Sequence, residues 1–105
     1  MMLQLTMSIL QQAQKRGNRA VVLVPEAAYR DALMAMACMY ITNSGRTVKM
    51  PNGNLLSVMI PKTPLSEVGE GFDLYLCGWG RAVQAEERLM MTWLNKARTV
   101  YTEIN

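Results

Sequence analysis

The chain has 105 residues, enough for one folded domain with one core. Half of the residues are hydrophobic and 18% are charged, with a net charge of +3, a balance that excludes a disordered chain. No apolar run approaches the roughly 20 residues that span a bilayer, and residues 1–16 lack the pattern of a signal peptide. We therefore predict one cytoplasmic domain over residues 1–105, with no membrane contact.

Histidine is absent, and the only two cysteines are Cys38 and Cys77. The commonest general base and the commonest metal ligand are therefore missing, and two cysteines alone do not build a structural zinc site. Each cysteine lies among apolar neighbours, so we predict two buried free thiols, with a disulfide or a reactive thiol as the alternative. We predict no metal, no cofactor and no catalytic residue.

The first half of the chain predicts a helix, a strand and a second helix. Apolar residues recur with helical spacing over residues 2–16, and Gly17 ends that segment. The run RAVVLVP is short, β-branched and ended by Pro25, which is typical of a buried strand. The segment EAAYRDALMAMACMYI has helical periodicity with Glu26 in its first turn, so it predicts a helix over residues 26–41.

The second half opens with the strongest short hairpin signal in the sequence. Asn52 and Gly53 tolerate positive φ and lie between two strand-like runs in GRTVKMPNGNLLSVMI. Pro51 beside the turn indicates that the outer strand is short or at an edge of the sheet. The remaining segments predict a loop over 61–71, a strand over 73–77 and a helix from Arg81 to about Tyr101.

The predicted order of elements is α–β–α–β–β–β–α. Helices that alternate with strands around a hairpin indicate an α/β fold. We predict a small mixed sheet of about four strands with one Asn-Gly hairpin, packed by three helices.

Two short features bear on function. The run GWGRAV follows a strand and opens a helix, so its backbone amides, with Arg81 alongside, could hold an anion. A small enzyme with an anion site at residues 78–81 is therefore one alternative, and a tight turn is the other.

Trp79, between two glycines, is either a lid on the core or an exposed contact residue. The ten methionines are either core filler or a deformable binding surface.

The order of these segments resembles part of the P-loop ATPase core of phage terminase large subunits and related helicases. The matching segments are QQAQKRGNRAVVLVP, VKMPNGNLLSVMI and GEGFDLYLCGW. The phosphate-binding loop of the family has no counterpart in the chain. At the positions of the family's metal-binding Asp and catalytic Glu stand Gly78 and Trp79. The resemblance implies an ATPase-like fold of phage origin without ATPase chemistry.

These observations favour a non-enzymatic, phage-encoded interaction protein that binds another protein or itself as a homo-oligomer. A sheet with a hairpin edge exposes backbone groups for self-pairing. Apolar residues on the glycine-flanked loop and at its end predict the contact region. The predicted partner-binding residues are Leu65, Val68, Phe72, Trp79 and Arg81.

The alternative is a nucleic-acid-binding accessory protein. Basic residues lie near the ends of several predicted elements, where the fold could bring them to one face. The predicted nucleic-acid-binding residues are Arg16, Arg19, Arg46, Lys49 and Arg98. Binding of this kind weakens steeply as salt rises.

Overall fold

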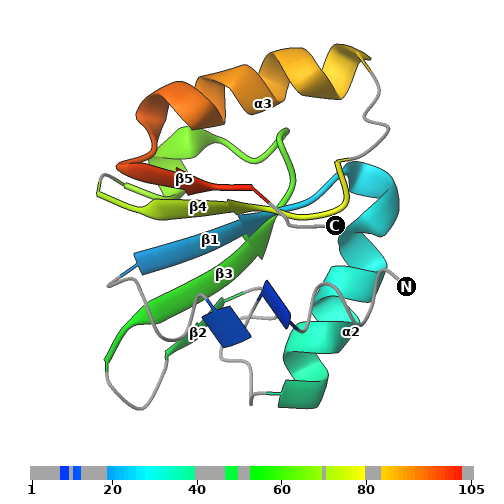
Figure 1. The fold of residues 1–105 in the computed structure, drawn as a ribbon, viewed down its shortest axis with the longest axis vertical. Coiled ribbons are helices and arrows are strands. Elements are labelled where there is room, and N and C mark those ends of the chain that lie inside the picture. The colour runs from blue at the N-terminus through cyan, green and yellow to red at the C-terminus, as the bar shows by residue number, and fades with distance from the viewer. Residues whose placement is uncertain are drawn as a thin grey trace.

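A computed structural model describes residues 8–9, 11–12, 19–39, 47–49, 53–69, 71–79 and 84–102. These ranges form one mixed sheet of five strands with two α-helices and two 3₁₀ turns (Figure 1), which confirms the predicted α/β class. The elements are β1 (Arg19–Leu23), η1 (Glu26–Ala28), α2 (Tyr29–Met39), β2 (Thr47–Lys49), β3 (Leu55–Met59), η2 (Leu65–Glu67), β4 (Asp73–Leu76), α3 (Gln84–Lys96) and β5 (Thr99–Tyr101). The helix predicted over residues 2–16 lies mostly outside the described residues, among which Ser8, Ile9, Gln11 and Gln12 have helical backbone.

The strands lie in the order β2-β3-β1-β4-β5. β1 pairs in parallel with both β3 and β4, and β4 pairs in parallel with β5, whereas β2 is antiparallel to β3. Val22 in β1 stands in register between Val58 and Tyr75. A central parallel strand is covered on both faces, which explains why RAVVL is almost uniformly apolar.

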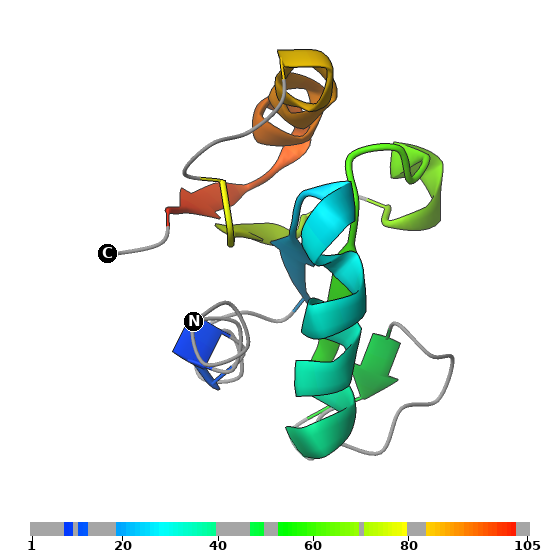
Figure 2. The same ribbon diagram turned by 90° about the vertical axis from the view of Figure 1, so that its right-hand side faces the viewer.

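The two helices lie on opposite faces of the sheet. The chain passes from β1 towards β3 through α2, and from β4 in the opposite direction to β5 through α3. Since such crossovers are right-handed, helices that lead in opposite directions must cover opposite faces. Figure 2 shows α3 and η2 on one side of the sheet and α2 towards the other.

Each face of the sheet has its own core. Side chains alternate along β1, so Ala20 and Val22 join the cluster under α2, while Val21 and Leu23 join the cluster under α3. Trp93 of α3 is fully buried at the centre of the second cluster. The sheet is thus a rigid middle layer between two apolar layers.

The last predicted helix needs correction. The prediction ran from Arg81 to about Tyr101, but α3 ends at Lys96 and a fifth strand, β5, follows. The Ala97 N–H still donates to the Trp93 carbonyl, whereas the Arg98 N–H donates to the Phe72 carbonyl and so joins the sheet. The β-branched and aromatic residues of β5 favour the extended backbone, and their order happens to continue the helical stripe.

The predicted antiparallel pairing on either side of Asn52-Gly53 is confirmed, with Lys49 opposite Leu55 and the turn between them only partly within the described residues. Thr47 pairs with Ser57 in the antiparallel ladder, and their hydroxyl oxygens lie 2.8 Å apart. Gly53 has a φ of +89°, which only glycine adopts without strain. Asn52 is outside the described residues. As Pro51 indicated, β2 is an edge strand of only three residues.

Candidate functional site

Two of the predicted partner-binding residues are core residues, which corrects their assignment. Val68 and Phe72 are both 0% exposed. The Phe72 ring meets the Trp93 ring edge to face, with ring centroids 5.9 Å apart and planes at 75°. The loop over 61–71 therefore folds against the sheet beneath α3, and its apolar side chains anchor it there rather than meet a partner.

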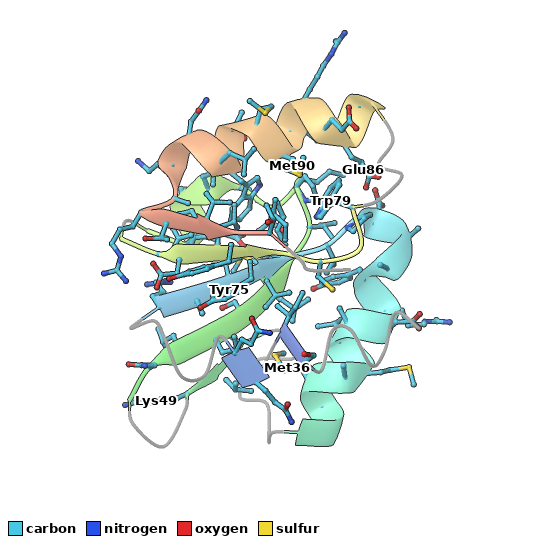
Figure 3. All side chains as sticks on the ribbon, in the orientation of Figure 1. Met36, Lys49, Tyr75, Trp79, Glu86 and Met90 are labelled. Carbon is cyan, nitrogen blue, oxygen red and sulfur yellow. The ribbon has the colours of Figure 1, made fainter. Side chains whose placement is uncertain are left out.

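Trp79 is half-buried at the carboxyl end of β4, where Figure 3 shows it beneath α3. Its indole N–H donates to the Leu23 carbonyl at 2.9 Å, and its ring packs against the core cluster under α3. The chain leaves β1 and β4 towards opposite faces here, and ligands of open α/β sheets often bind between two such strand ends. In this protein the Trp79 side chain reaches from the end of β4 to Leu23 at the end of β1, and so lies where such a ligand would bind.

The other two predicted contact residues have different outcomes. Leu65 is half-buried in η2 and packs against the core cluster under α3. Arg81 lies outside the described residues, as does Gly80, so the predicted anion site over 78–81 is described only at Gly78 and Trp79.

Two exposed apolar side chains lie on α3 and β5, and sequence reasoning selected neither of them. Met91 is 52% exposed and Val100 is 38% exposed. Val100 is in register with Leu74, a core residue beneath α3, so Val100 faces the α3 side of the sheet. Met90 packs towards the sheet. In a right-handed β4–α3–β5 crossover, the rotation of the helix from Met90 to Met91 places Met91 on the flank of α3 that is nearer to β5.

A hollow lies along this flank of α3. Its volume is about 440 Å³, and it is lined by Glu87, Arg88, Met90 and Met91. Met90 and Met91 supply an apolar floor, and the charged residues one turn earlier supply a polar rim. We call Met91, Val100 and this hollow the α3–β5 surface.

Three of the five predicted nucleic-acid-binding residues come together at the amino ends of the parallel strands. Arg19 and Lys49 both stand in register with Leu55, so they lie on either side of the same residue of β3. Arg98 precedes Thr99, and Thr99 shares its register with Asp73 and Ala20. Arg19 and Lys49 face the α3 side of the sheet and form a row that we call the amino edge, whereas Arg98 bonds to Asp73, which alternates with Leu74 and so faces the α2 side. Arg16 and Arg46 lie outside the described residues.

Arg98 is held by a buried carboxylate. Its Nε and Nη2 atoms donate to the two oxygens of Asp73 at 3.1 and 2.9 Å. The Arg98 side chain is 50% exposed, whereas that of Asp73 is only 3% exposed. The hydrogen bond from Arg98 to Asp73, and then the charge of Asp73, raise the pKa of Arg98 above its usual value. The guanidinium therefore stays protonated throughout the physiological range, but Asp73 offsets its charge.

A second hollow, of about 390 Å³, opens between η2 and the end of α3, lined by Leu65, Ser66, Gly69 and Lys96. Arg19 does not line this hollow, but its Nη1 lies 3.8 Å from the position that a Cβ on the lining residue Gly69 would take. We call this the basic hollow. The sequence signal for it was the basic last turn of α3, but Lys96 was not in the predicted nucleic-acid set.

The carboxyl ends of the strands are linked by polar contacts. The Glu26 N–H donates to Glu86 Oε1 at 2.7 Å, and the Lys62 ammonium lies 3.1 Å from Glu26 Oε2. Figure 3 shows Glu86 at the start of α3, on the same side as Trp79. These contacts join α3, η1 and the segment after β3, so these polar groups are already engaged with one another.

Cys77 is buried and, among the residues that the structure describes, forms no disulfide, as predicted. The side chain of Cys38 lies outside the described residues. Across the ranges described, no group of three or more Cys, Asp or Glu side chains is placed to hold a metal ion. Nor does any helix within those ranges have the length and apolar character needed to cross a membrane.

Comparisons with protein-family models, with curated proteins and with solved structures found no match to this chain.

Proposed function

We propose that this is a non-enzymatic interaction protein and that the α3–β5 surface binds its partner, either another protein or a second copy. The observation that supports this most is the exposure of Met91 and Val100, both on the α3 side of the sheet, together with the hollow along α3. An apolar centre with a charged rim is the usual composition of a protein-binding patch. Methionine side chains adapt their shape to a partner, which suits them to such a surface.

The exposed surface of α3 supports the proposal better than pairing at the sheet edges does. β2 and β5, the two edge strands, have three residues each. Short edges, particularly with a lysine such as Lys49, are a common protection against edge-to-edge pairing. Contact through side chains of α3 and β5 does not depend on the length of either edge.

The proposal includes a phage origin and an ATPase-like shell that lacks ATPase chemistry. Its support is the order β1, α2, hairpin, β4, with Gly78 and Trp79 after β4 where the resembling family carries its acidic pair. ATP hydrolysis by the purified chain would contradict this part.

A peptide library tests the α3–β5 surface. Peptides from a random displayed library are selected on the wild-type protein, and their affinities are then measured for Met91→Lys. We expect affinity to fall at least about tenfold, because a charge in the centre of an apolar contact remains desolvated without a partner. The introduced lysine would also lie four residues after Glu87, a helix-stabilising spacing, so folding should be unaffected.

Met34→Lys is the matched control. Met34 is 53% exposed, nearly the same as Met91, but it lies on α2 at the other face of the sheet. Its replacement should leave peptide affinity within about twofold, a change of well under 1.4 kcal/mol. If both variants weakened binding equally, or neither did, the α3–β5 surface would not be the contact site.

A second candidate function is nucleic-acid binding at the amino edge. The observation in its favour is the register that aligns Arg19 and Lys49 on either side of Leu55. Phosphate contacts by such a row would act additively and without sequence preference.

The salt dependence of binding to a double-stranded DNA oligonucleotide tests this candidate. Each phosphate contact contributes about −0.9 to the slope of log K against log salt. We expect Arg19→Gln and Lys49→Gln each to make the slope shallower by about one phosphate contact. Arg88→Gln, on α3 away from the amino edge, is the control and should leave the slope unchanged. Affinity that ignores salt, or equal effects of all three variants, would exclude the amino edge.

A further inference from the structure

We propose that the basic hollow binds a phosphate group, with Arg19 and Lys96 as its cationic contacts. This inference goes beyond the second candidate function, because the ligand that it names is a phosphate monoester rather than a nucleic-acid backbone. The hollow lies between η2 and the last turn of α3, at the same ends of the strands as the amino edge. Its volume of about 390 Å³ accommodates a phosphate together with part of the group that carries it.

Arg19 gives the strongest reason to expect an anion. It is the first residue of β1 and is half-buried, yet it forms no ion pair within the described part of the chain. Partial burial of a guanidinium without a counter-charge is unfavourable, and an anion in the hollow would remove that cost. Arginine presents a planar fork of donors that matches phosphate oxygens.

Gly69 keeps the space beside this guanidinium open. Its φ of +80° is a conformation that residues with a side chain adopt only with strain. A side chain here would also begin within 3.8 Å of Arg19 Nη1. A residue with a side chain at this position would therefore be strained by its φ, and its Cβ would be in ordinary van der Waals contact with the Arg19 guanidinium.

Of the other groups around the basic hollow, some favour the binding of an anion and some oppose it. The carbonyl end of a helix carries partial negative charge, so the end of α3 opposes an anion and Lys96 has to offset it. Lys96 also takes part in another interaction, as does Glu67 in η2. The Ser66 hydroxyl adds one neutral donor at the lining of the hollow. Arg19 is therefore the principal contact and Lys96 the supporting one.

The charge of the ligand favours a phosphate monoester over a phosphodiester. A terminal phosphate carries a charge of about −1.5 to −2 at pH 7 and can enter a recess, while its ester group contacts Leu65. A nucleic-acid phosphodiester has one charge and is attached on both sides. Both sources share the phosphate, so the experiment has an arm for each.

The test follows backbone amide signals of the ¹⁵N-labelled protein while inorganic phosphate, phenyl phosphate, dimethyl phosphate or the DNA oligonucleotide is added. We expect saturable shifts at Ser66 and Gly69 with the first two ligands, and phenyl phosphate should bind more tightly because it reaches Leu65. Arg19→Gln should weaken this binding at least about tenfold, as expected when a charge-assisted contact is lost. Arg19→Lys should restore part of it, and Lys49→Gln should leave it unchanged.

The outcomes separate this inference from the nucleic-acid function. If no shift appears at Ser66 or Gly69 with phosphate at up to about 10 mM, the basic hollow is not a phosphate site, even if DNA binds through Arg19 and Lys49. If phosphate binds there and DNA does not bind at all, the phosphate site stands and the nucleic-acid function falls. Equal weakening by Arg19→Gln and Lys49→Gln would indicate general attraction to the amino edge and would overturn the site. Thermal unfolding of each variant confirms that it is folded.

Discussion

Replacement of Trp93 by alanine should lower the free energy of unfolding by about 3–5 kcal/mol, the usual cost of removing a large buried aromatic side chain. Trp93 is 0% exposed and lies at the centre of the core cluster between α3 and the sheet. Its ring contacts Phe72, and its indole N–H donates to the Pro61 carbonyl at 3.1 Å. Alanine removes all of these contacts and leaves a cavity that the sheet cannot close.

Urea denaturation checks this expectation, with Trp93→Phe as the comparison. Phenylalanine keeps an aromatic ring against Phe72 but leaves the buried Pro61 carbonyl without its donor, at a cost of about 1–3 kcal/mol. Whole domains are stable by only about 5–15 kcal/mol, so at the low end of that range Trp93→Ala leaves little folded protein, and the milder variant then gives the measurable value. A loss below about 1 kcal/mol for Trp93→Ala would contradict the described packing of α3.

Replacement of Phe72 by alanine should cost a similar amount, again about 3–5 kcal/mol, since Phe72 is also 0% exposed. The residue immediately precedes β4 and packs beneath α3. This result would identify Phe72 as a core residue, in contrast to the contact role that the sequence suggested.

The comparison variant is Leu65→Ala, in the loop that precedes Phe72. Leu65 is only half-buried, so its truncation should cost clearly less than that of Phe72 in the same urea titration. Equal losses, or a Phe72→Ala variant as stable as the wild type, would mean that the loop over 61–71 does not anchor to the sheet as described. Trp93 and Phe72 are in contact, so their combined effect should not be the sum of the two.

The sequence predicted the central elements well because their signals are local. The β-branched run before Pro25 became β1, and Asn52-Gly53 marked the hairpin between β2 and β3. β5 was missed because Val100 continues the helical spacing of α3, and only pairing with β4 reveals these residues as a strand. Such a short strand depends on its neighbour rather than on its own propensity.

The candidate sites depend on distances along the sheet, which the sequence does not contain. Arg19 and Lys49 are far apart in the chain but meet through Leu55, a pairing that requires the register of three strands. Val68 and Phe72 were assigned to a surface because the prolines and glycines around them indicate a loop. Their burial shows that a loop can carry core residues when its apolar side chains pack under a helix.

The most direct test of the proposed function is to map where a selected peptide binds. The ¹⁵N amide spectrum of the wild-type protein is recorded during titration with a peptide taken from the library selection. The proposal predicts that the largest shifts lie in α3 around Met91 and in β5 around Val100, with little change at Gly69 or in α2. Shifts centred on α2 or on the basic hollow, with α3 and β5 unchanged, would contradict it.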